Sequence, residues 1–293
     1  MTGGPVGAGV LPVDKPSGPT SHDVVRKVRS TLNLRRVGHT GTLDPFASGL
    51  LLVCVGAATR LSEYLTSLDK VYRATFVLGT RTTTHDPEGE VVAVDRGWEG
   101  LDRTRIEAAL APLRGEILQR PPVFSAKKVA GEAAHRRARR GETVTLAPSR
   151  VRVFEMEIIE VELPAIRLEV RCSSGTYIRA LARDLGEGLG VGAHVSELRR
   201  LAVGRFRVEG ATPMHDLAEA DLGPSWISPA EALAHLPRLE LGPEDATRLS
   251  LGGGVPLTRS MTEGGPIAVV RGASLVAVAA VEGGVLRPRK VFK

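Results

Sequence analysis

The segment at residues 70–79, KVYRATFVLG, alternates its side chains between two faces, and this pattern constrains the fold more than any other stretch. One face carries only apolar or aromatic side chains, namely Tyr72, Ala74, Phe76 and Leu78. A period of two is typical of a β-strand that lies with one face on a core. Because the backbone groups of a buried strand need hydrogen-bonding partners, the chain must build a sheet around this segment.

Further segments predict both strands and helices. We expect strands at 9–13, 50–55, 151–163 and 166–174, the last two forming a pair, and we expect residues 90–95 to pair back onto 70–79. Helices are expected after a cap at Thr20 or Ser21 and at 57–65, 102–113 and 176–189. This mixture favours an α/β protein of the α+β type, with a mixed, mainly antiparallel sheet and no regular βαβ series.

The composition changes after about residue 225. A short helix is expected at 228–235, followed by three strands, Ile267–Val270, Leu275–Val281 and Val285–Val291, joined by glycine-rich turns. We therefore expect a main domain over residues 1–225 and a small β module over residues 226–293.

The composition excludes several classes of protein. The longest apolar run, Leu50–Val55, is far shorter than the ~20 residues of a membrane span, and we expect no secretory signal. The two cysteines, Cys54 and Cys172, lie in apolar or alternating segments and are expected to be buried free thiols in a reduced, cytoplasmic protein. The histidines show no metal-binding spacing, so we expect no metal. The net charge of +6 favours a polyanionic partner.

Positive charge is concentrated within a segment at about 121–146. Its centre, KKVAGEAAHRRARR at 127–140, holds a single acid, Glu132. Six candidates for contacts to a phosphate backbone lie here: Lys127, Lys128, Arg136, Arg137, Arg139 and Arg140. The alternative is a solvated basic helix face. We favour a projecting helical arm that binds phosphates, because such one-sided charge is costly without a counter-charge.

Asp44 stands in an unusual setting within the stretch VGHTGTLDPFASGLLLV at 37–53. A carboxylate between glycines and beside a proline commonly hydrogen-bonds local backbone N–H groups. The same position at the edge of a sheet suits a nucleophile or an acid–base group. Both interpretations are open on this stretch alone.

Three residues elsewhere are candidates for the same site. Arg179 is expected in the first turn of a helix, where the helix dipole disfavours a cation unless an anion lies near. Tyr177 begins that helix, and Tyr72 lies on the apolar face of its strand. Aromatic rings close to a basic arm suit stacking on unpaired bases, although a core position is the ordinary alternative for Tyr72.

Several stretches together resemble the TruB-type tRNA pseudouridine synthases. LPVDKPSGPTS, GHTGTLDPFASGLLL and KVYRATFVLG are similar to the family's first motif, its nucleophile-bearing motif and the adjacent strand. SSGTYIRALARDLG and GAHVSELRRL resemble its third block, so the resemblance covers roughly residues 9–210. The tail resembles, more loosely, the family's PUA-like RNA-binding module. Phe46 and Ser48 stand where Leu and Thr are commoner.

The resemblance implies a pseudouridine synthase fold and isomerisation of uridine 55 in the TΨC loop of tRNA, without cofactor or metal. Asp44 matches the family's catalytic aspartate, and Arg179 matches the arginine that pairs with it. Tyr72 matches the residue that stacks on the target base and takes part in proton transfer. Tyr177 and Leu198 match positions that line the pocket, and His39 matches the residue that enters the space left by the flipped base. The basic segment matches a thumb loop over the T arm, and we expect a monomer.

The resemblance leaves the chemical route open, since the carboxylate can attack C6, attack C1′ or take the C2′ proton. Two other functions remain as alternatives. A non-catalytic module that binds or folds tRNA would share the basic arm and the β tail, but would not need Asp44, Tyr72 and Arg179 together. A related synthase would modify a different uridine.

Overall fold

The computed structural model describes residues 7–125, 127–129, 131–218, 221–257 and 261–292. Within these residues a ten-stranded mixed sheet forms the body of the molecule. Eight strands follow one another in the order β14 (Thr212–Pro213), β1 (Gly9–Lys15), β3 (Ser48–Val55), β12 (Ala193–Val203), β4 (Lys70–Leu78), β11 (Ala165–Cys172), β10 (Ser149–Glu162) and β7 (Gly115–Gln119). β2 (Val37–Thr40) pairs with β3, and β13 (Phe206–Arg207) pairs with β12.

Most neighbours in this sheet are antiparallel, and the exceptions are the β1–β14 and β3–β12 pairs. The prediction of a mixed, mainly antiparallel sheet is therefore confirmed. The expected pairing of 151–163 with 166–174 is also present, as β10 and β11.

The pairing predicted for residues 90–95 is wrong. β6 (Val91–Val94) pairs with β5 (Thr80–Thr82) in a separate two-stranded sheet, whereas β4 lies between β11 and β12. Alternation along one strand indicates a sheet but does not identify the partner strand, and here both partners come from more than 80 residues away in the sequence.

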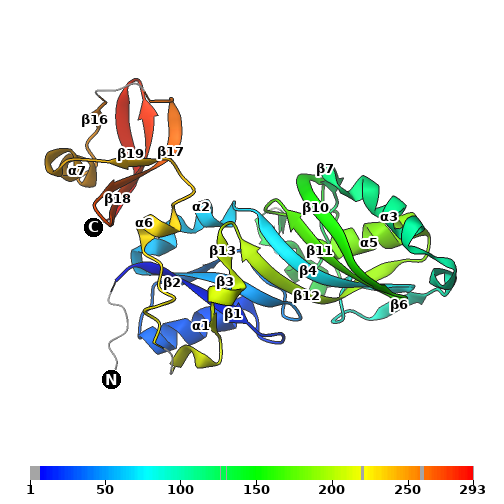
Figure 1. The fold of residues 1–293 in the computed structure, drawn as a ribbon. Coiled ribbons are helices and arrows are strands. Elements are labelled where there is room, and N and C mark those ends of the chain that lie inside the picture. The colour runs from blue at the N-terminus through cyan, green and yellow to red at the C-terminus, as the bar shows by residue number, and fades with distance from the viewer. Residues whose placement is uncertain (1–6, 126, 130, 219–220, 258–260, 293) are drawn as a thin grey trace.

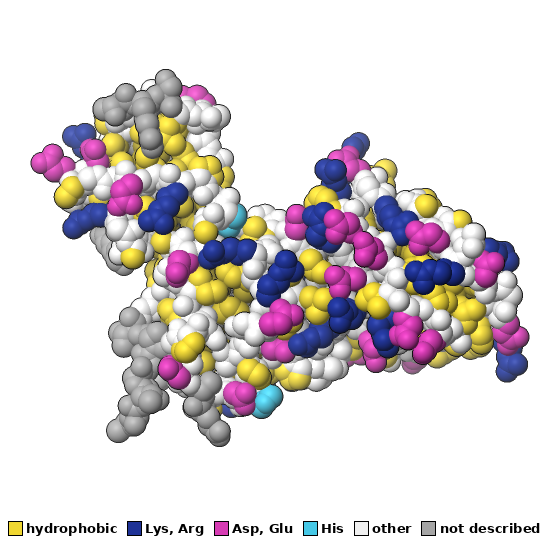
Figure 2. Space-filling model, in the orientation of Figure 1, with side chains coloured by type: hydrophobic (Ala, Val, Ile, Leu, Met, Phe, Trp, Pro, Cys, Tyr) yellow, Lys and Arg dark blue, Asp and Glu magenta, His cyan; other side chains and the backbone are white. Residues whose placement is uncertain are grey.

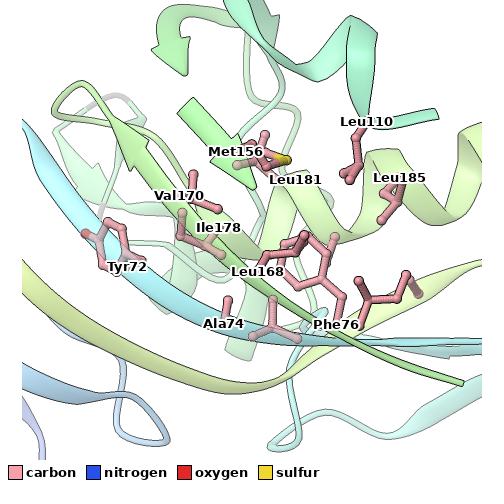
Figure 3. Packing of buried hydrophobic residues seen from close by; sticks show 14 of the residues in the cluster. Tyr72, Ala74, Phe76, Leu110, Met156, Leu168, Val170, Ile178, Leu181 and Leu185 are labelled. Carbon is pink, nitrogen blue, oxygen red and sulfur yellow. The ribbon is translucent and has the colours of Figure 1, made fainter. Parts of the chain in front are cut away.

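Helices cover the sheet on both sides (Figure 1). α1 (Ser21–Leu32) begins at a capping box formed by Thr20 and Asp23 and packs on β1 and β3. α3 (Arg103–Leu110) and α5 (Ile178–Leu189) cover β4, β10 and β11. Figure 3 shows this core, in which Tyr72 lies at one edge of a cluster that includes Phe76, Leu168 and Leu181.

Shorter elements complete the main body. The expected helix at 57–65 is a 3-10 turn, Gly56–Leu61, followed by α2 (Ser62–Thr66). Four further 3-10 turns are described, at Gly97–Gly100, Ala111–Leu113, Val208–Gly210 and Asp216–Ala218. The predicted helical arm at 127–140 is instead a hairpin, β8 (Lys128–Val129) with β9 (Glu132–Ala133), that leads into α4 (Ala134–Arg139). Gly131 at the hairpin turn has a positive φ of 87°, which interrupts the helical conformation.

A second sheet forms near the C-terminus, at the end of the molecule where α2 and α6 lie (Figure 1). Its strand order is β15 (Arg238–Glu240), β17 (Gly264–Arg271), β18 (Ser274–Glu282), β19 (Val285–Val291) and β16 (Val255–Pro256). It contains the three strands expected there, and α7 (Pro243–Ser250) packs against it. The helix expected at 228–235 is only α6 (Pro229–Ala232), capped by Ser228.

The two sheets share apolar and polar contacts. Phe292 and Val278 of the second sheet belong to one buried cluster with Leu61 and Leu65 of the main body. Arg60 donates a hydrogen bond of 2.5 Å to the carbonyl of Val291 and lies over the Phe292 ring, 5.3 Å from its centroid. Among the described residues, none of the helices is both long and apolar enough to cross a membrane.

Candidate active site

The Asp44 loop, residues 41–47, connects β2 to β3 and is held from two sides. The buried Lys15 ammonium donates hydrogen bonds to the carbonyls of Pro16, Pro19 and Pro45, at 2.9, 2.8 and 3.2 Å. The Ser21 hydroxyl donates to the Leu43 carbonyl at 3.0 Å and accepts from the Leu43 N–H at 2.8 Å. These contacts fix the loop to β1 and to the first turn of α1. Burial lowers the pKa of Lys15 to about 8, although the nearby Asp44 carboxylate acts in the opposite direction.

Arg200 of β12 also holds the Asp44 loop in place. Its Nε donates to the Leu50 carbonyl at 2.7 Å, and its Nη2 donates to the Gly41 carbonyl at 3.1 Å. Gly49 lies directly against the Arg200 backbone at the parallel β3–β12 contact, with a positive φ of 103°. A Cβ at this glycine would lie only 2.3 Å from the Arg200 carbonyl oxygen, so this approach requires glycine.

Asp44 belongs to a buried ionic triad. Arg179 places its Nε 2.9 Å from Asp44 Oδ2 and its Nη1 2.9 Å from Asp86 Oδ2. The side chains of Arg179 and Asp86 are 4% and 3% exposed, whereas Asp44 keeps 34% of its side-chain surface. Arg179 also donates to the carbonyls of Thr84 and Phe124, at 2.9 and 2.8 Å. The guanidinium is therefore fixed on every edge, and of the two carboxylates Asp44 is the one with appreciable exposed surface.

The triad sets the electrostatics of Asp44. Burial raises the pKa of this carboxyl above its ordinary value, Arg179 opposes the shift, and the negative charge of Asp86 adds to it. A carboxylate that is incompletely solvated and still reachable is suited to act as a nucleophile or a base.

A cavity of about 260 Å³ opens beside Asp44. Its lining brings together the aromatic and apolar residues expected at the site, Tyr72, Tyr177 and Leu198, with Arg179. Gln119 fixes the start of α5, since its side-chain amide donates to the Tyr177 carbonyl at 3.1 Å and accepts from the Tyr177 N–H at 2.8 Å. Burial raises the pKa of the Tyr72 hydroxyl, while Arg200 acts against this shift.

A second cavity, of about 600 Å³, is also lined by Asp44 and Arg179. His39 lines it together with His22, Asp86 and Phe124. Burial and the charge of Arg200 lower the pKa of His39, so its imidazole is neutral at pH 7. The buried Nδ1 of His39 has no hydrogen-bond partner among the described residues.

Two arginines of the basic segment at 121–146 are already paired with glutamates. Arg140 is paired with Glu132 at 2.6 Å and Glu142 at 2.7 Å, and Arg137 is paired with Glu142 at 2.6 Å. Arg136 is exposed and Lys127 is partly exposed, whereas the side chains of Lys128 and Arg139 lie outside the described residues. In the view of Figure 2, basic and acidic side chains are interspersed over the long sheet.

Sequence reasoning missed three residues that build the site. Asp86 lies in a turn with its neighbours Thr84 and Pro87, where an Asp is ordinarily a local cap, and it does accept such bonds from Thr84 and Glu88. Arg200 lies in β12, where a register shift between Val195 and Glu197 breaks the alternation. A strict period of two from Ala193 would have placed Arg200 outside, whereas it is buried. Lys70 carried a usable signal, since the period of two puts it on the same face as Tyr72.

The chain was compared with known proteins. Residues 29–178 match the N-terminal domain of the TruB family pseudouridylate synthases, and residues 179–233 match the tRNA pseudouridylate synthase B C-terminal domain. A tRNA pseudouridine synthase B of Mycobacterium sp. strain KMS is 46% identical over 250 residues, which are 84% of each chain. One from Ralstonia nicotianae is 42% identical over 295 residues, covering 97% of this chain and 93% of the other.

Solved structures give the same result for the fold. A chain of a Cbf5–Nop10–Gar1 complex superimposes with a TM-score of 0.76 and 29% identity, over 97% of this chain and 85% of the other. A chain of an H/ACA ribonucleoprotein bound to a substrate RNA containing 2′-deoxyuridine gives a TM-score of 0.75 with 27% identity, over 97% of this chain and 85% of that one. The family match covers just over half of the chain and the curated relatives nearly all of it. The chain therefore belongs to the TruB family of pseudouridylate synthases.

Proposed function

We propose that this protein isomerises uridine to pseudouridine at position 55, in the TΨC loop of tRNA. The observation that carries the proposal is the Arg179-bound carboxylate of Asp44 at the mouth of a cavity that also contains Tyr72 and Leu198. The names of the curated relatives, tRNA pseudouridine synthase B, support tRNA as the substrate. The net charge of +6 suits an RNA ligand.

In this proposal Asp44 is the nucleophile and the target uridine is flipped out of its loop. A base stacked within a folded RNA loop must leave the stack before a side chain can reach it. The carboxylate then acts at C6, at C1′ or on the C2′ proton, the N1–C1′ bond breaks, and C5 bonds to C1′. The surrounding apolar side chains exclude water and strengthen each charge interaction.

The neighbouring residues have distinct roles. Tyr72 stacks on the base and accepts the C5 proton, directly or through water. Tyr177 and Leu198 line the pocket, and Arg179 binds Asp44. His39 enters the space that the flipped base leaves. Its buried Nδ1, which has no hydrogen-bond partner in the described part of the chain, lies beside the second cavity and supports a contact with RNA.

Other parts of the chain bind the T arm. We assign RNA-backbone contacts to Lys127, Lys128, Arg136, Arg137, Arg139 and Arg140 of a thumb over residues 121–146. Residues 1–225 act as the catalytic domain, and residues 226–293 act as a PUA-like RNA-binding module. The protein works in the cytoplasm as a monomer, without cofactor or metal.

The proposal is tested by tritium release from tRNA that carries C5-labelled uridine, with pseudouridine then mapped by position. Wild type should release tritium from position 55, and Asp44→Asn should bind tRNA normally but not turn over, because the amide keeps the shape and lacks the charge. Activity of the Asn variant close to wild type would contradict the assignment of Asp44. Product at another position would favour a related synthase, and tRNA binding without any release by wild type would favour an RNA-folding module.

A further inference from the structure

Two buried cations in the cavity have no place in the chemistry described so far. Lys70 and Arg200 line the same cavity as Asp44, and they are 5% and 1% exposed. Within the described part of the chain, the ion pairs at this cavity are those of Arg179, and no carboxylate pairs with Lys70 or Arg200. A buried charge without a counter-charge is costly, so its retention calls for a ligand that supplies the opposite charge.

Neutral acceptors occupy only some of the N–H donors of each cation. The Lys70 ammonium donates to the carbonyls of Thr66 and Leu68 at 2.5 and 2.6 Å. Arg200 donates to the Leu50 and Gly41 carbonyls, and its side chain also hydrogen-bonds the Tyr72 hydroxyl. An ammonium has three donors and a guanidinium five, so N–H donors remain on both groups after these bonds.

The two cations flank the ring on which the target base is proposed to stack. Lys70 lies two residues before Tyr72 on the same face of β4, and Arg200 is the direct cross-strand partner of Tyr72 in β12. Burial, together with the charge of Arg200, lowers the pKa of Lys70 to about 8, so the ammonium is still protonated at pH 7. An anion placed over Tyr72 would relieve the unfavourable proximity of these two charges.

The proposed reaction produces such an anion. When Asp44 acts at C1′ or on the C2′ proton, the N1–C1′ bond breaks with its electron pair on the base, which becomes a uracil anion with its charge spread over N1, O2 and O4. The base then turns, and C5 bonds to C1′ as the Asp44 carboxylate leaves C1′ or returns its proton to C2′. The C5 proton then leaves and N1 gains a proton, which restores a neutral base. Resting on the proposed function, we propose that Lys70 and Arg200 are catalytic residues that bind and stabilise the detached uracil anion while it turns over Tyr72.

A purely structural role makes a different prediction. In a purely structural role, Lys70 holds the turn between α2 and β4 and Arg200 holds the Asp44 loop. Loss of Lys70 would then lower stability, and any effect on rate would not depend on how well the base carries negative charge.

The test compares two substrates, tRNA with uridine and tRNA with 5-fluorouridine at position 55. Fluorine stabilises the anion of the departing base. The rate at which the C-linked nucleoside forms is measured in single-turnover experiments with saturating enzyme, once for Lys70→Met and once for wild type. We expect Lys70→Met to be slower by about 10²-fold on uridine, as when one donor aimed at a developing charge is removed. The loss on 5-fluorouridine should be much smaller, and the Kd for tRNA should not change.

Arg73→Met is the matched control, because Arg73 lies on the opposite face of β4 and pairs with Glu169 at the surface. Lys70→Gln, which keeps a donor without the charge, replaces the Met variant if that variant does not fold. Arg200→Lys, which keeps the charge, should retain more activity than Arg200→Gln. A Lys70 variant as fast as Arg73→Met, or equally slow on both substrates, would overturn the inference. Failure of wild type to convert uridine 55 would instead contradict the proposed function.

Discussion

At the scale of single residues, Asp44 is a carboxyl group whose negative charge the fold disfavours. Its folded-state pKa is raised above the ordinary value of 3.8, because burial and Asp86 outweigh Arg179. A raised pKa means that the group contributes stability below its unfolded pKa and loses that contribution as pH rises through the folded pKa. The reactive carboxylate is therefore kept at the expense of stability, as is common in active sites.

Asp44→Asn should consequently be more stable than wild type at pH 7. The amide carries no charge to desolvate, and Arg179 keeps its ion pair with Asp86. The gain should shrink as pH falls through the folded pKa of Asp44 and vanish below about 3.8. Urea unfolding of both proteins across this pH range measures the difference, and equal stability at neutral pH would show that Arg179 fully compensates the buried charge.

Asp86 should control the acidic limb of the pH–rate profile. Its negative charge raises the pKa of Asp44, so Asp86→Asn should lower that pKa and move the acidic limb of the single-turnover rate to lower pH. The Asn side chain can still accept from Thr84 and from the Glu88 N–H, which preserves the turn. Glu90→Gln, at an exposed position in the same segment, is the control. A shift toward higher pH would mean that Asp86 acts by orienting Arg179 and not by its charge.

At the scale of elements, the contribution of the basic arm to RNA binding depends on the ion pairs that its arginines already form. Arg140 is bound by two glutamates, whereas Arg136 is exposed and has no ion pair among the described residues. A cation already neutralised by carboxylates displaces fewer counterions when it meets a phosphate.

Arg136→Ala should therefore weaken tRNA binding more than Arg140→Ala. If Arg136 contacts one phosphate, its loss should reduce the log–log slope of affinity against salt by about 0.7–0.9. Arg140→Ala should change the slope less, since it also releases Glu132 and Glu142. Filter binding at several salt concentrations measures both. An unchanged slope for Arg136→Ala would identify the arm as a solvated surface.

The sequence predicted those elements whose own residues carry the determining pattern. The alternation of β4, β10 and β11 and the cap of α1 are local, and these elements form as expected. Pairing across the sheet is not local, which is why the partner proposed for β6 was wrong. The same limit applies to the site: the setting of Asp44 and the placement of Arg179 in a first helical turn are local signals. Asp86 became recognisable only when the fold brought it to Arg179.

At the scale of the whole molecule, the second sheet shares its core with the main body. Phe292 is 8% exposed and packs in the cluster that contains Leu61 and Leu65. Lys290 reinforces the contact by donating to the Arg60 carbonyl at 2.7 Å and by pairing with Glu63. The two parts should therefore unfold in one cooperative transition.

Phe292→Ala should lower the stability of the main body as well as that of the second sheet. Truncation of a buried phenylalanine costs about 3–5 kcal/mol. Both tryptophans report on the main body, because Trp98 packs on the core under α3 and α5 and Trp226 packs on the cluster beneath α1. Tryptophan fluorescence during denaturation should thus show an earlier transition, whereas Val91→Ala, at an exposed position, should not. An unchanged fluorescence midpoint in Phe292→Ala would show that the two sheets unfold independently.

The place of β12 between β3 and β4 has a consequence for the order of events during synthesis. A ribosome-bound chain that ends before residue 193 lacks the strand that joins these two neighbours, and it also lacks Arg200. The Asp44 loop then keeps its contacts to β1, α1 and Arg179 but lacks those to Arg200, and the sheet that buries the triad is incomplete. The free-energy cost of desolvating these three charged side chains arises only after β12 has paired with β3 and β4, when most of the apolar core is buried as well. We therefore expect chains truncated before residue 193 to be inactive, and the candidate site to form in a single late step of folding.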